Sequence, residues 1–206
     1  SLGIPTLALQ KALTFALEQD AQPLDAMLIN QQYYGLIGAG QGYDSLFIKG
    51  ATRRLKQQYG FLAYIFSFLC TFFTYHNRQY TVVVDGEKHI FGAKLVVVFN
   101  TLSLKGLPLD HNISPQDGVL DVIALSPRSL WDVLRIAGVY LLQLPKHNVT
   151  RLRTFRGKHI SINEKGGRDI QVDGEIFPGK NLQVEVVPQA LNVVYTKKFC
   201  NQKTHR

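Results

Sequence analysis

The chain has 206 residues, a formal net charge of +8 and a hydrophobic fraction of 46%. This length and composition are typical of one globular domain with its own core, and they exclude an intrinsically disordered tail. The only cysteines, Cys70 and Cys200, are too few for a disulfide framework or a cysteine-based zinc site, which favours a reducing, cytoplasmic setting. The positive charge favours an anionic partner, either nucleic acid or a phospholipid surface.

Helices and short strands are both expected in the first part of the chain. Apolar residues recur at helical spacing from Thr6 to Gln19 and predict an amphipathic helix. Leu24–Gly40 predicts two short strands around the polar Asn30–Gln32. Residues 43–59 predict a helix that continues into the apolar segment 60–75. This segment is shorter than the roughly 20 apolar residues of a membrane-spanning helix, so it predicts a buried or interfacial helix.

Strands dominate the remainder. The runs of β-branched residues from Gln79 to Asn100 are separated by Asp-Gly and Phe-Gly and predict consecutive antiparallel strands. A loop over 101–118 precedes a strand at Val119–Leu125, and then a helix is expected with Ser126 as its cap and a proline in its first turn. Alternating segments from Thr150 to Tyr195 predict more strands. The expected fold is mainly β in an α+β chain: an antiparallel β-sandwich-like domain with several peripheral helices.

The tetrapeptide Val-Asp-Gly-Glu occurs twice, at Val84–Glu87 and at Val172–Glu175. Asp-Gly is a favoured two-residue hairpin connection, so both copies are expected to be hairpin turns and local chemistry does not distinguish them. The glycine-rich Gly38–Asp44 is not a dinucleotide-binding fingerprint, because Tyr43 stands where that motif needs glycine. No phosphate-binding loop, zinc-protease motif or hydrolase nucleophile motif is present in the sequence.

Several short segments, each too common to be informative alone, together resemble the sequence pattern of one protein family. They are GQGYDS (40–45), KQQYGFLAY (56–64), VVVFN (96–100), SPQDGVLDV (114–122), RGKHISI (156–162) and VDGEIFPG (172–179), followed by VVPQAL (186–191). In order and spacing they resemble the C-terminal domain of the diacylglycerol kinase and sphingosine kinase superfamily, especially its bacterial lipid kinases. The resemblance extends over nearly the whole chain.

In that family an α/β nucleotide-binding domain with a Gly-Gly-Asp-Gly-Thr loop comes first, and this sequence has no such loop. The resemblance therefore implies a single C-terminal domain over 1–206, with a linker helix at 1–20, a β-rich core at 21–196 and a basic tail at 197–206. The implied function is the C-terminal half of an ATP-dependent lipid kinase that transfers the γ-phosphate of ATP to a lipid hydroxyl such as that of diacylglycerol. Without the ATP-binding domain, the isolated chain is expected to be inactive.

The resemblance also assigns site residues. Glu175 falls where the family keeps the general base that takes the proton of the lipid hydroxyl. Mg²⁺ is expected at the side chain of Asp117 and the backbone carbonyls of Ser114 and Val119, an all-oxygen set for a hard cation. The preceding segment 102–114 lacks the glycine cluster that is usual in the family, so a plain loop before a strand is an equal alternative.

The implied partners are a lipid substrate, an anionic membrane surface and the upstream ATP-binding domain, with a homodimer left open. The implied location of the protein is cytoplasmic and peripheral to the membrane. Most of Phe61–Tyr75 is expected to pack under the sheet, and Phe72 and Phe73 to reach a lipid. A nucleic-acid partner is not expected, because no recognised module accompanies the basic residues between Arg151 and Arg168. The alternative function is a non-catalytic domain that binds a lipid or a membrane surface.

Overall fold

The computed structural model describes residues 9–42, 76–101, 115–129, 131–132, 151–167 and 169–194. The expected helices at 43–59 and 60–75, with Phe72 and Phe73, lie outside the described residues, as do most of the 101–118 loop and the basic tail. Within the described part, no helix is long and apolar enough to cross a membrane.

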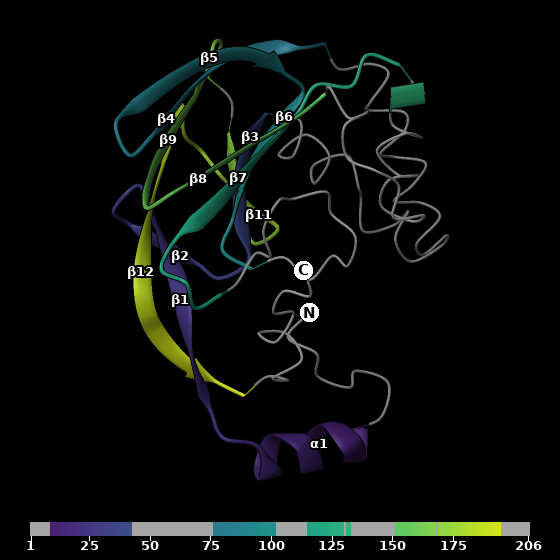
Figure 1. Ribbon diagram of the computed structural model, residues 1–206, viewed down its shortest axis with the longest axis vertical. Coiled ribbons are helices and arrows are strands. Elements are labelled where there is room, and N and C mark those ends of the chain that lie inside the picture. Colours follow the sequence, from purple (N-terminus) through teal and green to yellow (C-terminus); the bar gives the residue numbers. More distant parts are fainter. Residues whose placement is uncertain are drawn as a thin grey trace, which may run out of the picture.

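The described chain forms two six-stranded antiparallel sheets (Figure 1). The first sheet has the order β2-β1-β12-β9-β4-β5 and the second has the order β11-β10-β3-β6-β7-β8. The elements are α1 (Leu9–Glu18), β1 (Gln22–Ile29), β2 (Tyr33–Gly35), β3 (Gly38–Gly42), β4 (Arg78–Val84), β5 (Glu87–Ala93), β6 (Leu95–Phe99), β7 (Leu120–Leu125), β8 (Leu152–Gly157), β9 (His159–Glu164), β10 (Ile170–Val172), β11 (Glu175–Phe177) and β12 (Asn181–Val193). The predicted antiparallel β-sandwich is confirmed.

The core lies between the two sheets and follows the two-residue period of the strands. Tyr80, Val82 and Val84 are buried along β4, and Ile160 and Ile162 are buried along the neighbouring β9. The middle of the second sheet is buried on both faces, since the consecutive residues 96–98 of β6 and 120–124 of β7 are all buried.

The first helix is confirmed as α1, which lies beyond the start of β1 and off the sandwich (Figure 1). Leu13 and Leu17, one helical turn apart, are 60% and 78% exposed. The apolar face of α1 therefore has no packing partner among the described residues.

The expected break at Phe91-Gly92 is wrong, because both residues continue β5. Gly92 still pairs with Gln79 of β4. The chain leaves the first sheet at Lys94, whose amide donates to the carbonyl of Leu125 at 2.8 Å, and it enters the second sheet as β6. Residue types alone do not show this change of sheet, because both strands carry the same kind of β-branched and apolar residues.

The predicted cap at Ser126 is also wrong. Ser126 extends the pairing of β7 with β8, since its amide donates to the Arg151 carbonyl at 3.0 Å. Three residues later, Ser129 Oγ accepts from the Asp132 amide at 3.2 Å, and Asp132 Oδ2 accepts from the Ser129 amide at 3.2 Å. This reciprocal pair is a capping box, so Ser129 is the cap.

Candidate functional site

Glu175 is the first residue of β11, at the edge of the second sheet, directly after the Asp173-Gly174 turn. Asp173 and Gly174 have φ angles of 49° and 95°, the left-handed values that a two-residue hairpin turn requires. Glu175 pairs with Val172 across this hairpin and is exposed. Its carboxylate is thus available to a ligand while its backbone is fixed by the ladder.

The carboxylate of Asp173 fastens this turn to the segment between β2 and β3. It accepts hydrogen bonds from the amides of Leu36 at 2.7 Å, Ile37 at 2.9 Å and Gly38 at 2.9 Å. The Asp173 amide donates in return to the Gly38 carbonyl at 2.9 Å. Glu175 therefore stands two residues from an anchored point, which suits a group that has to be held in one position.

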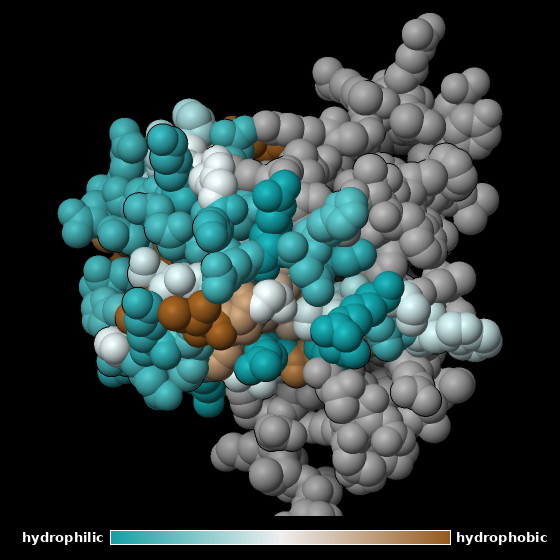
Figure 2. Space-filling view, turned by 90° about the horizontal axis from the view of Figure 1, so that it is seen from above, coloured by the Kyte–Doolittle hydropathy of each residue, from teal (hydrophilic) through white to brown (hydrophobic). Residues whose placement is uncertain are grey.

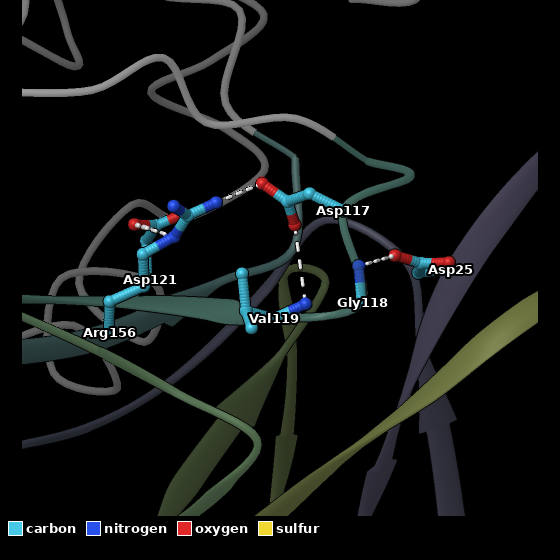
Figure 3. A network of polar contacts seen from close by, with 6 residues as sticks. All are labelled: Asp25, Asp117, Gly118, Val119, Asp121 and Arg156. Carbon is cyan, nitrogen blue, oxygen red and sulfur yellow. Dashed lines mark hydrogen bonds and ion pairs between the residues drawn. The ribbon is translucent and has the colours of Figure 1, made fainter.

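Asp117 lies in the turn before β7 and is held by charge and by a local hydrogen bond (Figure 3). Its Oδ2 forms an ion pair with Arg156 Nη2, and its Oδ1 accepts from the Val119 amide at 3.2 Å. Arg156 Nε also lies 3.7 Å from Asp121 Oδ1. The pKa of Asp117 is raised above the ordinary value of 3.8, mainly by burial and also by the Asp121 and Asp25 carboxylates, while Arg156 and the Val119 amide act in the opposite direction.

Asp25 supports the same turn from β1. It is 1% exposed, and its Oδ2 accepts from the Gly118 amide at 2.8 Å (Figure 3). Its Oδ1 accepts from the amide of Gln189, which adopts a φ of 52° where β12 bulges beside β1. Asp25 therefore connects the turn that carries Asp117 to the longest strand of the first sheet.

Asn100 connects the two predicted positions. It is fully buried just after β6, and its Nδ2 donates to the carbonyls of Asp25 at 2.7 Å and Leu36 at 3.0 Å. Asp25 holds Gly118 and Leu36 donates to Asp173, so a continuous chain of hydrogen bonds runs from the Asp117 turn to the Glu175 turn. The sequence did not predict a role for Asp25 or Asn100. Two signals were present: Asp25 lies within an apolar strand, and Asn100 ends an apolar run.

Strand register places both turns at one end of the second sheet. Gly38 pairs with Phe99, and Phe99 pairs with Asp121, which pairs with Arg156 of β8. Asp173 donates to Gly38 at the same level. Four strand spacings of about 4.8 Å separate β11 from β7, so the Glu175 and Asp117 turns are roughly 19 Å apart along this edge.

The residues that the structure describes include only part of the expected magnesium site. Ser114 lies outside them, and Val119 meets Asp117 through its amide. Arg156 already pairs with the carboxylate that was expected to bind the ion. No group of three or more His, Cys, Asp or Glu side chains in the described ranges could hold a metal ion. The magnesium site stays a prediction.

The fold matches that of known proteins. The family model described as the YegS C-terminal NAD kinase beta sandwich-like domain matches residues 38–195. A crystal structure titled as a diacylglycerol kinase of Bacillus anthracis superposes with a TM-score of 0.72 at 22% identity, covering 96% of this chain and 64% of that one. The chain belongs to this β-sandwich family, the C-terminal domain of the YegS and diacylglycerol kinase family.

Relatives in the family carry kinase names. The diacylglycerol kinase of Bacillus subtilis is 25% identical over 184 residues, which is 87% of this chain and 60% of that protein. A Shewanella frigidimarina protein named "Probable lipid kinase YegS-like" is 24% identical over 189 residues, 90% of this chain and 60% of that protein. The chain thus spans about 60% of the length of these two relatives. The resemblance to the bacterial lipid kinases is confirmed.

Proposed function

We propose that this chain is the C-terminal domain of an ATP-dependent lipid kinase, which presents a general base and a lipid-facing surface to a nucleotide-binding domain outside these 206 residues. The observation that carries the proposal is family membership over residues 38–195, together with relatives that are named lipid kinases. Diacylglycerol, the substrate in the name of the Bacillus subtilis relative, is the substrate class proposed first.

Glu175 is the proposed general base. In phosphoryl transfer to a lipid, the hydroxyl oxygen attacks the γ-phosphorus of ATP, the bond to the β,γ-bridging oxygen breaks, and ADP leaves. A carboxylate within hydrogen-bond reach orients the hydroxyl and takes its proton. Glu175 suits this role because it is exposed at a sheet edge and follows the turn that Asp173 anchors.

The nucleotide-binding domain is the proposed partner of α1. Leu13 and Leu17 form an exposed apolar pair on a helix that lies off the sandwich. Packing this face against another domain would remove apolar surface from water, at about 25 cal/mol per Å² buried. In this proposal the membrane supplies the lipid, so the assembled protein works at a cytoplasmic membrane surface, with Mg²⁺ accompanying ATP.

The test is ATP-dependent phosphorylation of diacylglycerol in mixed micelles by a protein in which a nucleotide-binding domain precedes this chain. We expect phosphatidic acid to form only when ATP and Mg²⁺ are both supplied, and the 206-residue chain alone to form none. Binding of anionic vesicles with no phosphorylation of any lipid by the two-domain protein would instead select the non-catalytic lipid-binding alternative.

A further inference from the structure

A small polar cavity of about 250 Å³ opens at the other end of β7 and β8 from the Asp117 turn. It is lined by Asn77, Phe91, Gly92, Ser126, Arg128, Arg151 and Arg153. Strand β7 runs from Leu120, near Asp117, to Leu125, next to Ser126, so about 20 Å of strand separates the two places. The cavity is therefore distinct from the proposed catalytic edge. Figure 2 views the molecule from above, where the described surface is mostly hydrophilic.

The charged side chains that line the cavity are all positive among the described residues. Arg128, Arg151 and Arg153 line it together, and its described lining contains no acidic side chain. Like charges at close range raise the energy of the folded chain, and an anion between them lowers it. Arg156 of the same strand provides the contrast, because it is paired with Asp117 and Asp121. The basic segment that begins at Arg151 thus divides into a structural arginine and arginines that face a cavity.

The side chain of Arg153 and the backbones of Arg128 and Arg151 are held before any ligand binds. The Arg153 guanidinium lies 5.4 Å from the centroid of the Phe91 ring, a cation–π arrangement. The Arg151 carbonyl accepts from the Ser126 amide at 3.0 Å, and the Arg128 amide donates to Asp132 Oδ2 at 2.7 Å. Less side-chain and backbone freedom is then lost on binding, which favours affinity.

We propose that this cavity is a binding site for a phosphate monoester or for inorganic phosphate. Guanidinium groups donate pairs of hydrogen bonds to phosphate oxygens, and such charge-assisted bonds are the stronger ones in proteins. Ser126 and Asn77 add neutral polar groups to the lining. A cavity of about 250 Å³ accepts one phosphate group and is smaller than most sites for drug-sized ligands. The site goes beyond the proposed kinase function and does not depend on Glu175.

The experiment titrates the 206-residue chain with inorganic phosphate by calorimetry at fixed ionic strength. A second arm measures co-sedimentation with phosphatidylcholine vesicles that contain either phosphatidic acid, a phosphate monoester, or phosphatidylglycerol, a diester. The cavity variants are Arg151→Gln/Arg153→Gln and, separately, Arg128→Gln. The matched control, Lys88→Gln/Lys158→Gln, removes the same charge from two exposed lysines outside the cavity. Circular dichroism checks that each variant is folded.

We expect binding of phosphate, or of phosphatidic acid in preference to phosphatidylglycerol, to weaken by about tenfold or more in the double cavity variant, and less in Arg128→Gln. The control should bind like the parent chain. Binding of soluble phosphate alone would identify free phosphate as the ligand of the cavity. Preference for phosphatidic acid vesicles would identify a lipid headgroup as the ligand. Absence of both kinds of binding in the parent chain, or equal weakening in the cavity and control variants, would overturn the proposal.

Discussion

Asp85 and Asp173 occupy equivalent positions in two Asp-Gly hairpins and make the same kind of contact. Both have left-handed φ angles, 48° and 49°. The Asp85 carboxylate accepts from the amides of Lys158 and His159, at 3.0 and 2.8 Å, as the Asp173 carboxylate accepts from the segment before β3. The repeated Val-Asp-Gly-Glu is thus an anchored turn in both copies.

Replacing either aspartate by alanine should lower the free energy of unfolding by about 1–2 kcal/mol, because backbone amides lose their acceptor. Asp85→Asn and Asp173→Asn should lose less, since asparagine tolerates the left-handed conformation and keeps one acceptor oxygen. Urea denaturation of the four variants measures this. Alanine variants as stable as the parent chain would show that the contacts do not anchor the turns.

Asn100 should matter more than an exposed asparagine, because its side chain holds two carbonyls at a fully buried position. Asn100→Ala should lower the free energy of unfolding by about 2–4 kcal/mol. Asn163→Ala is the control, since Asn163 bonds an exposed partner, Asn181, and its loss should be within about 0.5 kcal/mol. Chemical denaturation of both variants compares the losses, and equal losses would refute the role given to Asn100.

Asp117 should give the chain a measurable pH dependence. Its pKa is raised in the folded state, mainly by burial, so the folded chain binds its proton more tightly than the unfolded chain. The stability from this group is therefore fully present below the ordinary pKa of 3.8 and is lost as the pH rises through the raised pKa. The difference in free energy of unfolding between the parent chain and Asp117→Asn should fall over this interval. If the parent chain instead gains stability relative to Asp117→Asn as the pH rises, the pKa of Asp117 is not raised in the folded state.

Residue types predicted the strands and turns, but not their partners. Alternating burial along β4 and β9 follows the sequence pattern, and Asp-Gly predicted both hairpins. The contact of Asp25 with Gly118 joins residues 93 positions apart, and only the pairing of whole strands brings them together. The Ser129 cap was missed because Ser126 precedes a proline and looks like a better start. The role of Glu175 came from family resemblance, since Glu87 has the same local chemistry.

That shared chemistry provides the control for the central claim. Glu87 follows the equivalent turn at the start of β5, and its side chain is 79% exposed. Glu175→Gln and Glu87→Gln remove the same charge from the same tetrapeptide and leave both turns intact. Any effect of net charge on lipid or membrane binding should therefore be common to both variants.

The decisive measurement is the rate of diacylglycerol phosphorylation by the two-domain protein carrying each variant, with ATP and lipid at saturation. If Glu175 is the general base, Glu175→Gln should lower kcat by about 10²–10⁴-fold, and Glu87→Gln should leave it near the parent value. Undiminished turnover in Glu175→Gln, or an equal loss in both variants, would contradict the assignment of Glu175.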